Sequence, residues 1–198
     1  DQSIETQPLP DIDLPERFMW SPWRKLSLWQ PGLGGLGGEV LFLDIDLVVT
    51  GNLDTFWSFH PGEVCVAENW TQLGKGIGNT SIYRWRIGEH TDIYEQYQRD
   101  PSTIHARFRI EQHFVSAMID NMVYWPRDWC ASFKHSLLPK FPMNWLKSPS
   151  LPPETRIVAF TGLPNHDQAR DGEWPAPWYK KAYKFAKPTP WIAEHWRD

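Results

Sequence analysis

Two carboxylates interrupt an otherwise apolar run between residues 40 and 49, which reads Val-Leu-Phe-Leu-Asp-Ile-Asp-Leu-Val-Val. A run of β-branched and aliphatic residues of this length predicts a strand covered on both faces, as in a parallel sheet. An ionised carboxylate in such a strand is costly unless a cation or strong hydrogen bonds compensate for its burial. Asp44 and Asp46 therefore mark a candidate metal or catalytic site. The alternative is an exposed sheet edge that leaves both acids in solvent.

The composition is that of a single globular domain. The 198 residues are 41% hydrophobic and 22% charged, and no internal repeat or linker divides residues 1–198. A net charge of -4 does not indicate the excess of basic residues that binding to nucleic acid usually requires. No apolar run approaches the roughly 18 residues that a membrane span needs. Cys65 and Cys130 lack metal-ligand spacing, which favours reduced thiols and a cytoplasmic location.

The beginning of the chain suggests an incomplete unit. It starts with polar residues and several prolines, without a Met or a signal-peptide pattern. An inner strand at 40–49 needs neighbours, and the earlier residues offer only a short apolar stretch. We therefore expect that an upstream strand-helix unit is missing from this sequence.

Hydrophobic periodicity and turn residues predict the remaining elements. We expect a single mixed, mostly parallel sheet flanked by helices, an α/β fold. The predicted helices cover 20–30, 53–57, 93–97 and 111–122, and the predicted strands, besides 40–49, cover 63–68, 79–83 (as a strand edge) and 156–160.

An aspartate pair at the end of a strand lies where α/β folds usually bind ligands. Two chemistries use such a pair. In the first, the carboxylates hold a divalent cation that neutralises a departing nucleotide diphosphate. In the second, the first aspartate attacks a phosphate itself.

Several short motifs, in this order, give the chain a resemblance to a known family. They are Trp23-Arg24-Lys25-Leu26, Leu41-Phe42-Leu43-Asp44-Ile45-Asp46, Gly51-Asn52-Leu53-Asp54, Gly78-Asn79-Thr80-Ser81, Glu111-Gln112 and Phe160-Thr161-Gly162-Leu163-Pro164. Together they resemble the nucleotide-sugar glycosyltransferases of GT-A fold, most closely glycosyltransferase family eight and the glycogenin-like group. The resemblance spans nearly the whole chain.

This resemblance implies a transferase that moves a sugar, with retention of configuration, from a nucleotide donor to a glycan or lipid-linked acceptor. UDP-sugar is the implied donor. Asp44 and Asp46 would hold Mn²⁺, or Mg²⁺, and Asp44 would also meet the nucleotide. The other implied donor-binding residues are Lys25, Arg24, Asn79, Ser81 and Gly162, and the implied catalytic residues are Gln112 and Glu111.

The chain departs from the family pattern at two of these motifs. Glu111 stands where Asp is common, and Thr161 stands where the family often has a histidine that binds the metal. The hydroxyl of a threonine is a poor substitute for imidazole as a ligand of a transition metal. Either Asp44 and Asp46 suffice with water, or His166 supplies the third ligand.

Each of these side chains also has a purely structural interpretation. Lys25 suits the solvated face of a helix, Asn79 a turn, Gln112 an early helix position and His166 an exposed loop. Lys134 is either a phosphate ligand or a surface lysine. The segment 178–187, rich in lysine and aromatic residues, is predicted to pack as a terminal helix or to touch the inner face of an anionic membrane.

Two other functions compete with the transferase. Residues 44–49 and the strand-end Thr161 resemble motifs of haloacid-dehalogenase-type phosphatases, although only about 36 residues follow Thr161, too few for the further strands such a phosphatase needs. The second is a catalytically degenerate transferase domain that only binds sugar.

Overall fold

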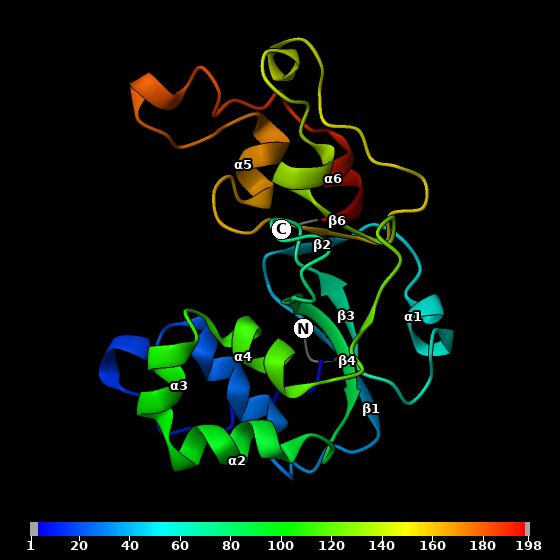
Figure 1. Cartoon of the computed structure of the whole chain (residues 1–198). Helices are drawn as coiled ribbons and strands as arrows, with labels where there is room; N and C mark the ends of the chain where they lie inside the picture. Colours follow the sequence, from blue (N-terminus) through cyan, green and yellow to red (C-terminus); the bar gives the residue numbers. More distant parts are fainter. Residues whose placement is uncertain (1–3, 197–198) are drawn as a thin grey trace.

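The computed structural model describes residues 4–196 and confirms a mixed α/β fold. Two sheets lie one above the other in Figure 1, each with its own group of helices. The strands are β1 (Glu39–Leu43), β2 (Leu47–Val49), β3 (Cys65–Glu68), β4 (Gly78–Arg86), β5 (Val123–Tyr124), β6 (Cys130–Ser132) and β7 (Ile157–Ala159). The α-helices are α1 (Asp54–Ser58), α2 (Thr91–Arg99), α3 (Pro101–Arg107), α4 (Glu111–Met118), α5 (His166–Asp171) and α6 (Trp191–His195). Short 3₁₀ helices cover Glu16–Phe18, Pro22–Trp29, Met143–Trp145 and Trp178–Lys180, and a π-helical turn covers Phe133–Leu137.

The first sheet has the strand order β1-β4-β3-β5. Strand β4 is its longest member, and its side chains alternate between two cores because successive residues of a strand face opposite sides. Tyr83 and Trp85 pack with the helices drawn at the lower left of Figure 1, whereas Ile82 packs on the other face with Phe56 of α1. This central strand is therefore buried on both sides.

The second sheet has the strand order β2-β7-β6. Val48 and Val158 pack against Ala169 of α5 and Ile192 of α6, which cover this sheet at the upper end of the molecule (Figure 1). The chain enters this sheet directly from β1, so residues 44–46 form the connection between the two sheets.

The prediction of one buried strand over 40–49 is wrong. The run divides into β1 and β2, which belong to different sheets, and the residues of β1 are only half-buried. The chain turns at the two aspartates, where Ile45 is 99% exposed. The division has a physical reason, since a continuous strand would carry both carboxylates into a sheet.

The pairing also differs from a mostly parallel sheet. Among the described strand pairs, β1–β4, β2–β7 and β3–β4 are antiparallel, and β3–β5 and β6–β7 are parallel. Strand β4 is central rather than an edge. The helix expected over 111–122 ends at Met118, and the segment expected as a terminal helix over 178–187 contains only one 3₁₀ turn.

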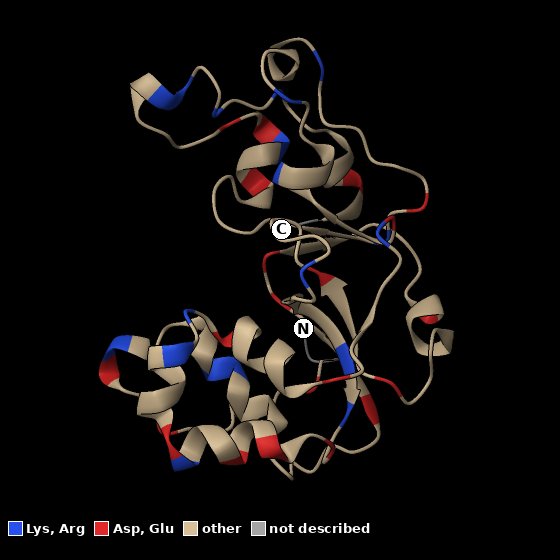
Figure 2. Cartoon of the chain, in the orientation of Figure 1, with Lys and Arg blue, Asp and Glu red and all other residues tan. Residues whose placement is uncertain are grey.

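Both cysteines are buried free thiols, and burial raises the pKa of Cys65 to about 11. Within residues 4–196, no helix has the length and apolar character that crossing a membrane requires. Lysines and acidic residues are unevenly distributed over the fold (Figure 2).

Candidate functional site

A cavity of about 350 Å³ lies where the two sheets meet. It collects polar side chains from β4 of the first sheet, from segments that follow β6 and β7 of the second, from α4 and from the 3₁₀ helix Pro22–Trp29. Its lining residues are Pro22, Lys25, Asp44, Asp46, Asn69, Trp70, Thr71, Asn79, Thr80, Ser81, Ile110, Glu111, Gln112, His135, Thr161 and Gly162. Eight of the side chains and glycines singled out in the sequence as site residues therefore meet in one place: Lys25, Asp44, Asp46, Asn79, Ser81, Glu111, Gln112 and Gly162.

Asp44 and Lys25 form an ion pair at this cavity. Asp44 directly follows β1, and its backbone N–H donates to the carbonyl of Ser81 over 3.0 Å. Lys25 reaches it from the 3₁₀ helix, whose buried Trp23 and Leu26 hold the helix against the core. The Lys25 ammonium also donates to the Thr80 carbonyl over 3.1 Å. A cation is thus fixed beside the first aspartate.

Asp46 carries an unsatisfied oxygen. Its Oδ1 is buried and has no hydrogen-bond partner among residues 4–196. Burial is the main cause that raises the pKa of this carboxyl above its usual range, and Asp44 adds to the rise, while Lys25 opposes it. An unpaired buried carboxylate oxygen next to a second carboxylate is the donor set that hard divalent cations prefer. The two aspartates therefore fit a metal such as Mn²⁺ or Mg²⁺.

The raised pKa predicts that Asp46 destabilises the fold at neutral pH. The folded chain binds the proton of the Asp46 carboxyl more tightly than the unfolded chain does. The resulting loss in the free energy of unfolding is therefore absent below the unfolded pKa of about 4 and grows as the pH rises. The neutral Asp46→Asn variant should therefore unfold with a free energy up to about 1 kcal/mol higher at neutral pH, a ceiling set by solvent screening. Urea unfolding of both proteins at neutral pH and near pH 3 measures this difference, which should vanish in acid. The exposed Asp120→Asn is the control, and an equal gain in that variant would contradict the prediction.

The first residues of β4 line the cavity from the opposite side. Gly78 is required there, because a Cβ at this position would lie 2.9 Å from both methyl carbons of Val66. The Asn79 side-chain oxygen accepts the Ser81 backbone N–H over 3.0 Å, which fixes the amide at the cavity wall. The Thr80 hydroxyl donates to the Glu111 carboxylate.

Glu111 is a buried carboxylate at the first turn of α4, where the helix dipole favours a negative charge. Gln112 follows it and is half-buried at the cavity. Glu111 and Asp44 both contribute to raising the pKa of the buried Tyr83 phenol, after the larger effect of burial. Both carboxylates therefore lie within electrostatic reach of one phenol.

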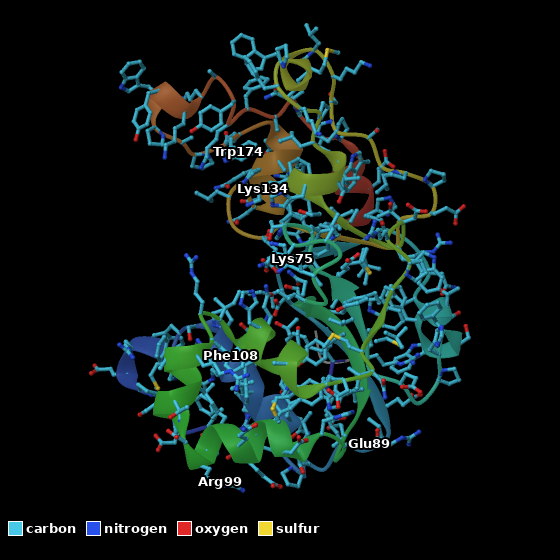
Figure 3. The ribbon with its side chains drawn as sticks, viewed as in Figure 1. Lys75, Glu89, Arg99, Phe108, Lys134 and Trp174 are labelled. Carbon is cyan, nitrogen blue, oxygen red and sulfur yellow. The ribbon has the colours of Figure 1, made fainter. Side chains whose placement is uncertain are left out.

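Three predicted site residues do not line the cavity. Arg24 is half-buried, and its Nε has no partner among the described residues. The Lys134 ammonium donates to the carbonyl of Thr161, so it supports the cavity edge from outside (labelled in Figure 3). His166 begins α5 and packs edge-on against Trp196 with the ring centroids 4.2 Å apart.

Burial and Asp44 raise the pKa of Asp46, and His166 is the last of the groups that oppose this rise. Across residues 4–196, however, no group of three or more His, Cys, Asp or Glu side chains is placed to hold a metal ion. The geometry offers the two aspartates as metal ligands and gives no support to His166 as the third.

Sequence reasoning missed one wall of the cavity. Asn69, Trp70 and Thr71 follow β3, and the buried Asn69 side chain accepts hydrogen bonds from the backbone and hydroxyl of Thr71. The Trp70 indole donates to the carbonyl of Cys130 over 3.0 Å, which ties this loop to the second sheet. Pro22, Thr80, Ile110 and His135 also line the cavity and were not predicted as site residues. The pair Asn69-Trp70, directly after the predicted strand 63–68, is the sequence feature that could have indicated this wall.

Comparison with models of protein families gives no match, and comparison with curated protein sequences gives none either. The solved structures that show similarity include the glycosyltransferase GlyE of Streptococcus pneumoniae TIGR4, at 19% sequence identity, and the galactosyltransferase LgtC in complex with donor and acceptor sugar analogues, at 12%. The TM-score is 0.45 in both cases, and each match covers 65% of this chain. The chain spans 35% of the length of the GlyE chain and 54% of the LgtC chain. We therefore base the function on the cavity and its side chains.

Proposed function

We propose that this chain is a domain of GT-A type from a metal-dependent glycosyltransferase, which moves a sugar from a nucleotide-diphosphate donor, UDP-sugar in the first instance, to a glycan or other acceptor. One observation carries the proposal: Asp44, Asp46, Lys25, Glu111 and Gln112, which come from three separate parts of the sequence, line a single cavity. Glycosyl transfer requires charge control at the leaving group and at the sugar, and this set of side chains offers both.

The leaving diphosphate gathers negative charge, which needs cations near it. Asp44 and Asp46 would hold a divalent metal, which supplies Lewis-acid stabilisation of that charge when bound. Lys25 adds a second positive charge that the protein itself fixes between Asp44 and the Thr80 carbonyl. The two aspartates and Lys25 therefore define the diphosphate end of the proposed site.

The sugar end lies at α4 and β4. A sugar that loses its leaving group passes through an oxocarbenium-like state, which nearby oxygens stabilise. Glu111, oriented by the Thr80 hydroxyl, supplies a carboxylate, and Gln112 supplies an amide. Asn79 and Ser81 present polar groups suited to sugar hydroxyls. Retention of the anomeric configuration belongs to the proposal, and NMR analysis of the product sugar tests it.

The phosphatase alternative fits the topology less well. That chemistry places its residues at the carboxyl ends of neighbouring parallel strands, whereas β2 pairs antiparallel with β7. In the described part of the chain, only helical elements follow β7. A degenerate sugar-binding domain differs from an active transferase in turnover alone.

Calorimetric titration of uridine diphosphate into the protein, with and without Mn²⁺, tests the proposal. We expect binding with Mn²⁺ and at least about tenfold weaker binding after chelation, because the two aspartates otherwise repel the diphosphate. Adenosine and guanosine diphosphate serve as matched ligands. Binding of either one in place of uridine diphosphate would show that only the proposed base is wrong. If none of the three binds with metal, the donor assignment is wrong. Metal-dependent hydrolysis of a UDP-sugar would separate an active transferase from a degenerate one, and phosphate release from simple monoesters would favour the phosphatase.

A further inference from the structure

Two segments far apart in the sequence lie side by side at the end of the molecule that is remote from α2. Residues 140–147 include the short helix Met143–Trp145, and residues 178–187 include the helix Trp178–Lys180. The Asn144 amide donates to the carbonyl of Phe185 over 2.9 Å, and the Trp145 indole donates to the carbonyl of Ala182 over 2.8 Å. We call the face that they form the lysine-aromatic surface; it lies at the top of Figure 1, in yellow-green and orange.

This surface exposes large apolar side chains. Trp178 is 84% exposed, Leu146 69% and Tyr179 60%. Five further exposed apolar residues belong to the surface: Phe141, Met143, Trp145, Tyr183 and Phe185. In Figure 3, side chains at this end stand away from the ribbon. Scattered exposed apolar residues are normal on a protein, whereas a concentration of this kind marks an interaction site.

The charge on the same surface has one sign. It carries Lys140, Lys147, Lys180, Lys181, Lys184 and Lys187, and neither 140–147 nor 178–187 contains an acidic residue. The whole chain has a net charge of -4, so the remainder carries -10 against the +6 of these lysines. Figure 2 shows lysines on the two segments and acidic residues mostly elsewhere. The partner of this surface must be both anionic and able to receive aromatic side chains.

A second cavity, of about 420 Å³, opens beside the surface. Lys181 and Lys184 line it together with the exposed Glu173 and the aromatic residues Trp174 and Phe185. Two ammonium groups outnumber the one carboxylate, and a net positive charge beside apolar rings suits a phosphate that is attached to an apolar chain. Burial lowers the pKa of Lys134, and the nearby Lys184 ammonium lowers it further. Lys134 contacts Thr161 at the edge of the first cavity.

We propose that the lysine-aromatic surface docks on an anionic phospholipid bilayer, with its Trp and Tyr side chains in the interfacial layer and a lipid phosphate in the cavity between Lys181 and Lys184. Tryptophan and tyrosine favour the membrane interface because their rings are amphipathic. Lysines near an anionic bilayer strengthen the binding by roughly fivefold each. Pairing of the same surface with a second copy would place six lysines against six, which is repulsive.

Co-sedimentation with vesicles tests the proposal on the whole chain. We expect binding to vesicles that contain phosphatidylglycerol, little binding to phosphatidylcholine alone, and weaker binding at high salt. Trp178→Ser should weaken the partition by about tenfold or more, through the loss of an interfacial ring. The matched control is Trp20→Ser, since Trp20 is 95% exposed and lies outside the surface.

A second set of variants tests the contribution of the lysine charges to vesicle binding. The double variant Lys181→Gln and Lys184→Gln should weaken binding by about 25-fold, whereas the exposed Lys75→Gln should leave it unchanged. Equal binding to both vesicle types, equal effects of the Trp178 and Trp20 variants, or dimerisation that Trp178→Ser abolishes would each overturn the proposal. Because the assay contains no nucleotide, a failure of the proposed function does not affect this result.

Discussion

Replacement of Asp44 by asparagine is expected to weaken Mn²⁺-dependent binding of uridine diphosphate by at least about 100-fold. The substitution removes one of the two carboxylates proposed to hold the metal and leaves the shape of the side chain unchanged. It also breaks the ion pair with Lys25, whose ammonium keeps its hydrogen bond to the Thr80 carbonyl. The fold should therefore survive, and calorimetric titration with and without metal measures the loss.

Two further variants make this result specific. Asp120→Asn removes an exposed carboxylate outside the cavity, so its affinity should equal that of the wild type. Asp46→Asn should lose the metal-dependent binding as well, although its fold gains stability at neutral pH. Unchanged binding in both Asp44→Asn and Asp46→Asn would refute the assignment of the metal to these residues.

The sequence predicted the position of the two aspartates in the fold better than it predicted the strand around them. Asp44 and Asp46 do lie at a strand end and at a cavity, as their burial cost predicts. The same cost explains why the run over 40–49 is not one strand, since the chain leaves the first sheet at Asp44 and enters the second at Leu47. A local apolar pattern cannot distinguish one buried strand from two short strands in different sheets.

The residues that sequence analysis missed depend on long-range contacts. Trp70 lines the cavity because its indole bonds to Cys130, which is 60 residues away along the chain. The segment 178–187 was expected either to form a packed terminal helix, because aromatic residues usually seek a core, or to touch a membrane. Its Ala182 and Phe185 carbonyls instead accept hydrogen bonds from the side chains of Trp145 and Asn144, and several of its aromatic rings are exposed. No periodicity within either segment contains this information.

Arg84 is a fully buried arginine in the centre of the first sheet. Its guanidinium donates to the carbonyls of Phe56 and His60, which belong to α1 and to the loop that follows it. The guanidinium also lies 5.5 Å from the Trp125 ring, and its Nε is 3.8 Å from the Glu39 carboxylate. This side chain therefore fastens the loop between α1 and β3 to the sheet.

Arg84→Met is expected to lower the free energy of unfolding by about 3 kcal/mol. Methionine fills most of the volume but leaves the buried Phe56 carbonyl without its guanidinium donor, and an unsatisfied buried group costs about 1–3 kcal/mol. The His60 carbonyl keeps the Glu63 N–H as a donor but loses a hydrogen bond from a charged group, which is worth about 1.5–3 kcal/mol. The relief of burying one charge offsets part of this loss. The matched control is Arg86→Met on the same strand, where the side chain is 49% exposed and its ion pair with Glu89 contributes at most about 1 kcal/mol. Urea unfolding followed by circular dichroism compares the two variants, and equal midpoints would show that Arg84 does not hold the loop.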